Sequence, residues 1–290
     1  MSGLPARIHT LGPVGTFSGQ AALRVRQHLL EGQPDAEIEV LYTRTIPEVV
    51  DRTMATPGDW GVIPIENSDT GTVLFAQDAM VAADVSVRLE VNVPVRFSLV
   101  GNVPPGEAVV VYSQPVAFDQ CSFFVSREMP RAQVKFTNSN TESGALALEH
   151  SGEAEGIAAI VPADFGAAHP GLLRAEYIQN YPRNTTRFLA LSASQVAPPP
   201  DFGRNKTAIL VEPAKDYPGL LYDLLSVFKA HNLNLCRLES RPAKITPWTY
   251  VFFLDFNNNA GSAEAIAALK RGDQQVRVLG SFDTLWIGED

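Results

Sequence analysis

Cysteine is scarce in this chain of 290 residues, which contains only Cys121 and Cys236. Two cysteines cannot form the framework of several disulfides that stabilises small secreted domains. Both stand in apolar runs, where a cysteine is usually a small buried residue. None of the five histidines pairs with a Cys, Asp or Glu at the spacing of a metal site. We therefore expect neither a disulfide framework nor a metal, and no cofactor.

Long apolar runs and basic stripes are also missing. No run approaches the roughly 20 residues that a membrane-spanning helix needs, and residues 1–7 lack the apolar core of a signal peptide. The net charge is −9, and no basic stripe is available to neutralise phosphates. The expectation is a soluble, cytoplasmic protein with no membrane or nucleic-acid partner.

Hydrophobic residues, in contrast, make up 45% of the chain, enough for a sizeable core, and the length suggests two domains. In the first two thirds, short apolar runs alternate with runs of helical spacing, which predicts an α/β fold with mainly parallel sheets. The expected strands are 8–11, 60–65, 109–112, 157–161 and 186–191. The expected helices are 18–30, 73–82, 116–127 and 142–150.

A valine-rich stretch at residues 85–100 predicts one or two long strands that cross between two lobes. We therefore expect a two-lobed first domain at 1–193 with a cleft between the lobes, as in periplasmic binding proteins. The first lobe is assigned to residues 7–83 with 178–193, and the second to residues 84–177.

The triple proline at residues 198–200 marks the clearest break, because prolines favour a stiff extended segment. We assign residues 194–205 to a linker and residues 206–290 to a second domain. Its expected elements are strand 207–211, helix 219–230, strands 236–240 and 249–255, helix 262–269 and strand 276–281. The order βαββαβ is the ferredoxin-like arrangement.

Polar loops follow several expected strands of the first domain, where open α/β sheets bind ligands. Backbone amides of residues 15–18 suit a carboxylate, and the Asn67 amide can both donate and accept a hydrogen bond. The ordinary alternative for these loops is a turn with a helix cap. In a regular strand, Asn184, Thr186 and Phe188 share one face, and Thr185 and Arg187 share the other. Thr186 and Arg187 therefore reach one ligand only if the strand is irregular or the ligand wraps around it.

Four motifs occur in one order and together carry a family resemblance. They are Gly12-Pro13-Val14-Gly15-Thr16-Phe17-Ser18, Pro64-Ile65-Glu66-Asn67-Ser68, Asn184-Thr185-Thr186-Arg187-Phe188 and Glu239-Ser240-Arg241-Pro242. Over residues 8–286 the chain resembles prephenate dehydratases with a C-terminal ACT regulatory domain. The resemblance implies decarboxylating dehydration of prephenate to phenylpyruvate, in L-phenylalanine biosynthesis. It implies catalytic roles for Thr186, Asn67 and Gln120, and substrate binding by Thr16, Ser68, Ser113, Thr141 and Arg187, the last as the carboxylate partner.

The second domain resembles the ACT domain through Pro218-Gly219-Leu220-Leu221, Asn234-Leu235 and the Glu-Ser-Arg-Pro motif. The resemblance implies that paired domains form a site for the effector L-phenylalanine, and hence a homodimer or homotetramer. The implied effector-binding residues are Gly219, Leu220, Asn234, Leu235, Glu239, Ser240, Arg241 and Pro242.

Some positions depart from the family pattern. Ser113-Gln114-Pro115-Val116 stands where relatives usually have Ser-His-Pro-Gln, and Gln114 cannot become a cation. Two alternatives stay open at this point. One is arogenate dehydratase, whose substrate carries an amino group in place of the keto group. The other is a non-catalytic sensor of aromatic amino acids, against which Asn67, Gln120 and Thr186 argue.

Overall fold

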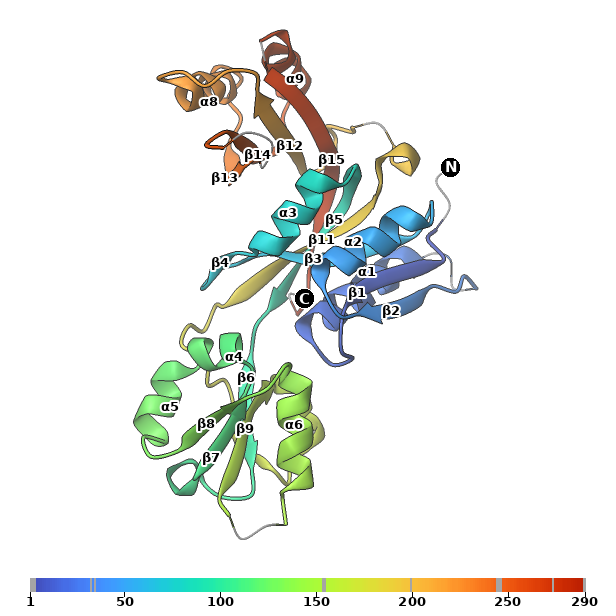
Figure 1. Ribbon diagram of the computed structural model, residues 1–290. Coiled ribbons are helices and arrows are strands. Elements are labelled where there is room, and N and C mark those ends of the chain that lie inside the picture. The colour runs from blue at the N-terminus through green and yellow to red at the C-terminus, as the bar shows by residue number, and fades with distance from the viewer. Residues whose placement is uncertain are drawn as a thin grey trace.

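The chain forms three units arranged one after another (Figure 1). This computed structural model describes residues 4–31, 33, 35–152, 155–198, 200–243, 247–272 and 274–288. A first lobe lies in the middle, a second lobe lies at one end, and the C-terminal domain lies at the other. Strands of the first lobe and the C-terminal domain belong to one sheet, and the second lobe has its own five-stranded sheet. The α/β class expected from the sequence is confirmed. The mainly parallel sheets expected for the first two thirds of the chain are wrong, because β11 pairs antiparallel with β3 and β5, and β6 pairs antiparallel with β9 and β10.

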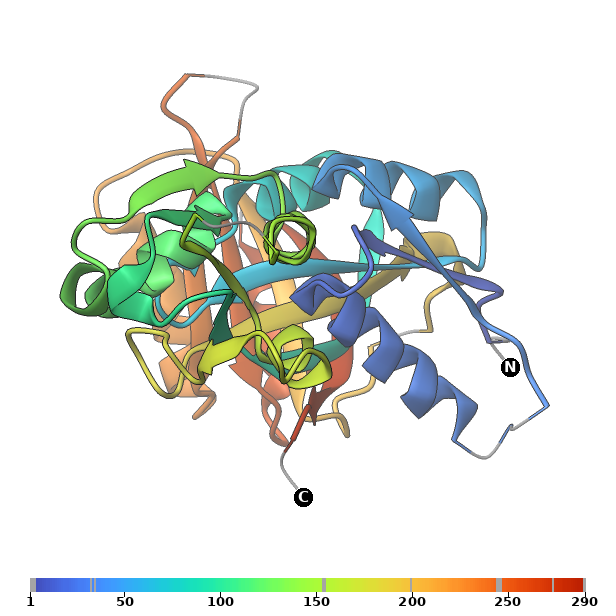
Figure 2. The same cartoon turned by 90° about the horizontal axis from the view of Figure 1, so that it is seen from below.

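The first lobe is built on strands β1, β2, β3, β5 and β11. Strand β1 pairs in parallel with β2 and β3, and β11 pairs antiparallel with β3 and β5. Helices α2 and α3 cover one face of this sheet and α1 covers the other (Figure 2). The bounds are β1 Arg7–Leu11, α1 Phe17–Leu30, β2 Glu39–Thr43, α2 Ile46–Ala55, β3 Trp60–Asn67, β4 Gly71–Thr72, α3 Leu74–Ala82, β5 Val85–Pro94 and β11 Thr185–Ala193.

The second lobe carries a sheet in the order β10-β6-β9-β7-β8. Its elements are β6 Phe97–Gly101, η1 Pro105–Glu107, β7 Val110–Ser113, α4 Pro115–Gln120, α5 Ser122–Glu128, β8 Gln133–Phe136, α6 Asn140–Glu149, β9 Ile157–Pro162, α7 Ala163–Ala168 and β10 Leu173–Ala175. The single helix expected at 116–127 is wrong, because two helices meet at Cys121. The Cys121 backbone has φ −119° and ψ 9°, and its N–H donates to the Phe118 carbonyl, a tighter bond than the α-helical one.

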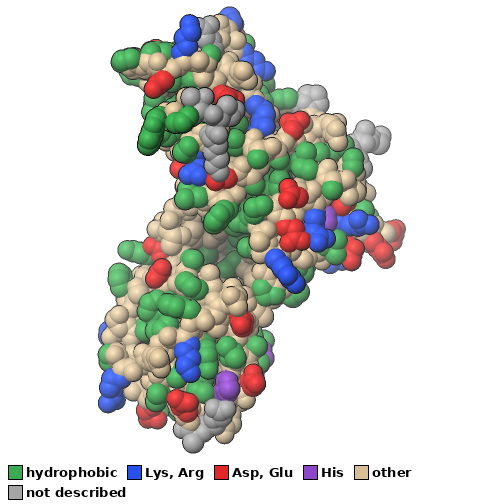
Figure 3. All heavy atoms as spheres, in the orientation of Figure 1, with side chains coloured by type: hydrophobic (Ala, Val, Ile, Leu, Met, Phe, Trp, Pro, Cys, Tyr) green, Lys and Arg blue, Asp and Glu red, His purple; other side chains and the backbone are tan. Residues whose placement is uncertain are grey.

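Two chain segments join the lobes. Residues 95–96 connect β5 to β6, so the valine-rich stretch consists of two strands in different sheets, which was one of the two expected arrangements. Because β5 pairs with β11, residues 85–94 lie in the first lobe and not, as expected from the sequence, in the second. The segment ahead of β11 returns, and Val95 N–H donates to the Asn184 carbonyl at 2.8 Å, which ties both crossings together. The space-filling view narrows between the second lobe and the remainder of the molecule (Figure 3).

The C-terminal domain has the expected βαββαβ order. Its sheet order is β13-β14-β12-β15, with each of these neighbouring pairs antiparallel, as in ferredoxin-like domains. After the short helix η2 Ser194–Val196, the elements are β12 Lys206–Pro213, α8 Leu220–Ala230, β13 Leu235–Pro242, β14 Tyr250–Asn257, α9 Ser262–Arg271 and β15 Gln274–Trp286. Strand β13 is an edge strand.

Strand β15 is longer than the sequence predicts and joins the two domains. Its last residues, 283–286, pair in parallel with residues 89–92 of β5. The junction needs Gly280, whose φ is +149°, because a Cβ there would collide with the Val87 carbonyl oxygen. The triple-proline segment falls partly outside the described residues, because Pro199 is not described. Shared sheet structure, and not only that segment, therefore connects the C-terminal domain to the first lobe.

Among the described residues, no helix is both long and apolar enough to cross a lipid bilayer. In the same ranges, no three His, Cys, Asp or Glu side chains gather in an arrangement that could hold a metal ion.

Candidate functional site

A β-bulge brings the polar ends of β3 and β11 onto one face. Thr186 pairs with Asn67 and Phe188 pairs with Pro64, with one register shift between them. Because β3 has an extra residue, Ile65, between these pairs, Pro64 and Asn67 both lie beside residues of the same face of β11. All four of the paired side chains line one pocket between the lobes. The bulge therefore aligns Asn67 with Thr186.

Three buried side-chain amides form a closed ring of hydrogen bonds at this pocket. Asn67 Nδ2 donates to Asn184 Oδ1 at 2.8 Å, and Asn184 Nδ2 donates to Gln120 Oε1 at 3.0 Å. Gln120 Nε2 donates to Asn67 Oδ1 at a longer 3.4 Å. Gln120 ends helix α4 of the second lobe, whereas Asn67 ends β3 of the first. The ring thus joins the two lobes behind the cleft.

Backbone groups fix which way the Asn67 amide points. The N–H groups of Asp69 and Thr70 each donate to Asn67 Oδ1 at 2.9 Å. Since a backbone N–H can only donate, the other end of this amide is its NH2 group. That group donates to Thr186 Oγ1 at 2.9 Å. Thr186 is therefore an acceptor toward Asn67, and among the described residues its own hydroxyl donates no hydrogen bond.

The rest of the pocket lining is neutral. The apolar residues come from both lobes: Phe17, Val73, Val95, Phe97, Val116, Ala117 and Phe188, together with Pro64. Polar lining comes from Asn67, Thr70, Gln114, Gln120, Asn140 and Thr186, and this described lining contains no Lys or Arg. The rings of Phe17 and Phe97 meet edge to face at 5.4 Å across the lobes. The pocket is thus neutral and largely apolar, with hydrogen-bonding groups from both lobes.

Four other residues expected at the substrate lie around this pocket in structural roles. Thr16 caps α1 by accepting from Gly19 N–H at 3.2 Å, and Ser68 accepts from Thr185 N–H at 2.9 Å. Ser113 is fully buried and donates to the Gln114 carbonyl. Thr141 at the start of α6 donates to the Val14 carbonyl at 3.1 Å, so it bridges the lobes. None of these four is among the pocket-lining residues.

Arg187 lies on the opposite face of β11 from Thr186. Its guanidinium is 3.2 Å from a Glu66 carboxylate oxygen, 3.5 Å from Glu90 and 3.9 Å from Asp255. The alternation expected along this strand is therefore present, and Arg187 does not line the pocket. In this geometry its cationic group is directed at the C-terminal domain and not at a ligand beside Thr186.

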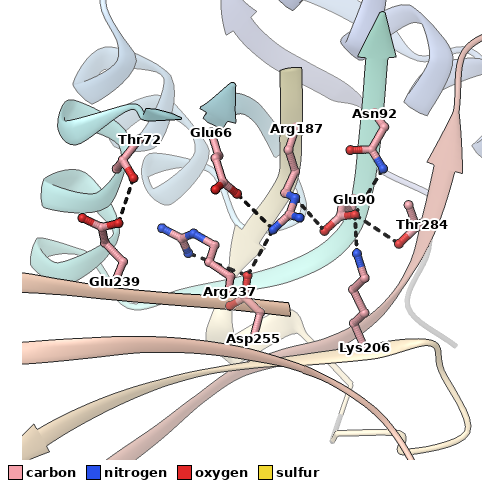
Figure 4. Close-up of polar contacts among 10 residues, drawn as sticks. All are labelled: Glu66, Thr72, Glu90, Asn92, Arg187, Lys206, Arg237, Glu239, Asp255 and Thr284. Atoms are coloured by element: carbon pink, nitrogen blue, oxygen red, sulfur yellow. Dashed lines mark hydrogen bonds and ion pairs between the residues drawn. The ribbon is translucent and has the colours of Figure 1, made fainter. Parts of the chain in front are cut away.

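Charged residues gather around Arg187 where the first lobe meets the C-terminal domain (Figure 4). Glu90 is completely buried and accepts from Lys206 Nζ at 2.7 Å. Asp255 is also buried, and Arg237 approaches it at 3.7 Å. Burial raises the pKa of Asp255, while Arg237 and Arg187 oppose that rise. We call the five residues Glu90, Arg187, Lys206, Arg237 and Asp255 the interdomain charge cluster.

Of the residues expected at an effector site, two contact the first lobe, and the others lie at the start of α8 or in and beside β13. Glu239 accepts from Thr72 Oγ1 at 2.8 Å, and Arg241 donates to Asp78 of α3 at 2.7 Å, so both contact the first lobe. Gly219, with φ +94°, precedes Leu220 at the start of α8. Leu235, Ser240 and Pro242 lie in β13, and the Asn234 carbonyl just before it accepts from Asn257 N–H.

The sequence reasoning missed Asn184 as a site residue. Its side chain is 2% exposed and completes the amide ring. The available signal was its position two residues before Thr186, which placed both side chains on one face. What the sequence could not supply was the partner on α4, because no local pattern relates residue 184 to residue 120.

Fold and site together define a two-lobed α/β protein with a neutral binding cleft between its lobes and a ferredoxin-like domain attached. The family profile described as prephenate dehydratase matches residues 8–196. The chain therefore belongs to the prephenate dehydratase family, whose members are hydro-lyases.

Relatives cover nearly the whole chain. The prephenate dehydratase of Amycolatopsis methanolica is 33% identical over 96% of this chain and 88% of its own length. A bifunctional chorismate mutase/prephenate dehydratase of Aquifex aeolicus is 33% identical over 98% of this chain and 75% of its own. The crystal structure of the Arthrobacter aurescens prephenate dehydratase in complex with L-Phe superposes with a TM-score of 0.79 at 30% identity, covering 96% of this chain and 90% of that one.

Proposed function

We propose that the cleft around Thr186 converts prephenate to phenylpyruvate. The ring carboxylate leaves as carbon dioxide, its bonding electrons enter the ring, and the ring hydroxyl takes up a proton and leaves as water. One proton is consumed for each prephenate. Aromatisation supplies the driving force, so the protein has to position the substrate and assist departure of the hydroxyl.

The observation that carries this proposal is the hydrogen bond from Asn67 Nδ2 to Thr186 Oγ1. Because Thr186 accepts there, its own proton is available to the leaving hydroxyl group. A threonine hydroxyl is a weak acid, so we assign it the role of a hydrogen-bond donor that strengthens as negative charge develops on the departing oxygen. Asn67 and Gln120 orient the donor and the substrate.

Substrate carboxylates are expected to bind to neutral groups. The described pocket lining has no cation, but it includes Phe17 and Asn140, the first residues of helices α1 and α6. Free backbone N–H groups and the positive end of the helix dipole favour anions at these positions. The Asn140 Oδ1 atom has no partner within the described residues, so this amide is free to reorient toward a ligand. The apolar lining of the pocket suits the ring.

The C-terminal domain is proposed to be an ACT domain that binds L-phenylalanine and lowers turnover. Support comes from its ferredoxin-like strand order and from the L-Phe complex of the Arthrobacter relative. Strand register adds a reason to expect paired chains. In the sheet, Pro242 pairs with Tyr250 and Leu235 pairs with Phe256, so Pro242 and Leu235 lie at opposite ends of β13. The loop that leads to Gly219 leaves β12 at the same end as Pro242, whereas Asn234 lies at the Leu235 end.

A site that uses both Gly219 and Asn234 would therefore need residues from two chains. Strand β13 has a free edge within the described chain, and a two-fold axis along that edge would bring the opposite ends of two sheets together. We accordingly expect a homodimer as the minimal effector-binding unit. A homotetramer would be a dimer of such dimers.

Three contacts support a direct route from effector to catalytic lobe. Glu239 binds Thr72 and Arg241 binds Asp78, and both partners follow closely after Asn67 in the chain. The interdomain charge cluster holds Arg187, the neighbour of Thr186. A shift of β13 would therefore act on the ends of β3 and β11, which carry the proposed catalytic groups. In this proposal the protein has two conformations, and bound phenylalanine favours the less active one.

The experiment that tests the proposal measures phenylpyruvate formation from prephenate by the purified chain, with and without L-phenylalanine. Parallel assays use arogenate, for which the product is phenylalanine. Turnover of prephenate that L-phenylalanine suppresses is the expected result. Turnover of arogenate but not of prephenate would identify the chain as an arogenate dehydratase. Phenylalanine binding without turnover of either substrate would identify it as a non-catalytic sensor.

A further inference from the structure

The amide ring contains one residue whose part in the reaction is unassigned. Asn184 comes from the segment that returns to the first lobe, and its backbone is fixed on both sides. Its N–H donates to the Tyr181 carbonyl at 3.1 Å, and its carbonyl accepts from Val95 N–H at 2.8 Å. A side chain held on such a backbone is well placed to orient mobile groups around it.

The hydrogen bonds of the ring can be read in only one direction. Backbone N–H groups fix Asn67 so that its NH2 group faces Asn184. Asn184 must then accept through Oδ1, which leaves its own NH2 group to donate to Gln120. Gln120 in turn accepts through Oε1 and presents Nε2 to Asn67 and the cleft. Asn184 is thus the link through which the fixed orientation of Asn67 determines that of Gln120 in the other lobe.

We propose that Asn184 is a positioning residue of the dehydration reaction, which locks the Gln120 amide across the lobe boundary with its NH2 group toward Asn67 and the substrate. The inference rests on the proposed function of the cleft. Asn184 does not line the pocket itself and acts through Asn67 and Gln120. Without its donated hydrogen bond, the Gln120 amide can turn over and set its oxygen against Asn67 Oδ1.

The variant that tests this is Asn184→Asp, which has nearly the same shape. A protonated carboxyl group can still accept from Asn67 and donate to Gln120, so it preserves the ring. An ionised carboxylate can only accept, so it breaks the ring. Charged residues on the segments that carry the ring are Glu66 and Asp69 near Asn67, Asp119 beside Gln120, and Arg183 beside Asn184, while Arg187 lies on the opposite face of β11. Burial raises the pKa of an introduced carboxyl group, which brings its titration toward neutral pH.

We expect kcat of Asn184→Asp to fall by about 100-fold as pH rises from 5.5 to 8.5, because misplacing a catalytic group by about 1 Å costs on that order. The wild-type chain and an Asn180→Asp control should lack this fall. Asn180 is a matched asparagine of the same segment, since its side chain donates to the Asp119 carbonyl and accepts from Phe123 N–H, with no hydrogen bond to the three ring amides within the described residues. Its backbone N–H donates to the Gln120 carbonyl at 2.6 Å, and the substitution keeps that bond.

A pH profile of Asn184→Asp that parallels the wild type would overturn the inference, because a purely structural loss lowers kcat equally at every pH. If the variant does not fold, NMR of the wild-type protein labelled with nitrogen-15 in Asn and Gln decides. The ring requires the Asn184 side-chain NH2 protons to exchange with water more slowly than those of exposed Gln27, and fast exchange would contradict it. An inactive wild type would instead overturn the proposed function itself.

Discussion

The two faces of strand β11 differ in the kind of polar chemistry that they carry. On one face, Thr186 accepts from the Asn67 amide, which is bonded in turn to the amides of Asn184 and Gln120, and the described pocket lining has no charged group. On the other face, one residue further along, Arg187 meets Glu66, Glu90 and Asp255. The strand alternation separates the two environments although their residues are neighbours in sequence.

The difference shows how one strand can serve both turnover and domain attachment. Neutral amides orient a donor without competing for its proton, and they leave the pocket free of a fixed charge that would bias a substrate carrying two carboxylates. Buried opposite charges, in contrast, hold two domains in one geometry, because separating them would leave charges without partners. Changes on the first face should therefore affect rate, and changes on the second should affect stability and regulation.

The largest expected effect is on the neutral face. Thr186→Val keeps the side-chain shape but removes the hydroxyl, and we expect kcat to fall about 100- to 1,000-fold, the usual loss when one donor to a developing negative charge is removed. Thr186→Ser, which retains the hydroxyl, should lose much less. Phenylpyruvate formation at saturating prephenate measures both, and a Thr186→Val variant as active as the wild type would exclude the proposed donor.

Stability should respond most on the charged face. Arg187→Met leaves buried Glu90 and Asp255 with one cation fewer, and we expect the free energy of unfolding to fall by about 3 kcal/mol. Arg52→Met is the matched control, since Arg52 pairs with Glu48 on the surface at 2.8 Å and should cost less than about 1 kcal/mol. Urea denaturation compares them.

The pH dependence of the Arg187→Met loss has a definite sign. Burial raises the pKa of Asp255 above its ordinary value of 3.8. A protonated Asp255 does not need Arg187, so the loss should be smaller at low pH and grow as pH rises through the pKa of Asp255. A large rise in KM for prephenate with unchanged stability would show instead that Arg187 binds the substrate carboxylate.

Local sequence patterns predicted many of the elements, but they missed β2, α2, β8, α7 and β10, and they gave no signal for long-range pairing. The βαββαβ order and the alternation along 184–188 both follow from periodicity, and both are present. The pairing of β15 with β5 had no local signal, since it depends on a glycine at position 280 and on backbone groups of a strand nearly 200 residues earlier.

Arg187 shows where two kinds of sequence inference disagreed. Resemblance assigned it to the substrate carboxylate, whereas strand geometry separated it from Thr186. The structure follows the geometry, because the bulge at Ile65 keeps Glu66 opposite Arg187 and Asn67 opposite Thr186. That Glu90 and Asp255 both lie beside Arg187 could not be predicted from the sequence. Glu90 is on β5 of the first lobe and Asp255 is on β14 of the C-terminal domain, so the two carboxylates meet only where the two units are in contact.

A smaller effect is expected where β13 touches the first lobe. Thr72→Val removes the 2.8 Å hydrogen bond to Glu239 without changing the pocket lining. We expect turnover without effector to stay near the wild-type value, and the L-phenylalanine concentration for half inhibition to rise about 5- to 10-fold, a coupling loss of about 1 kcal/mol. Thr56→Val, at an exposed threonine on the first lobe, is the control. Equal inhibition curves for all three proteins would remove this contact from the proposed route.

The smallest expected effect uses Cys236 as a reporter of the charge cluster. Burial raises the pKa of its thiol, Asp255 and Glu90 raise it further, and Lys206 and Arg187 oppose them. Asp255→Asn removes a negative neighbour, so the thiol pKa should fall and its alkylation by iodoacetamide should begin at lower pH. Cys121 should stay unreactive in the folded chain, because complete burial also raises its pKa.

The control for this experiment is a substitution on the neutral face of β11. Asn67→Asp should leave the pH profile of Cys236 alkylation nearly unchanged, because β11 lies between the two regions. Equal shifts in both variants would mean that the two faces are not electrostatically separate.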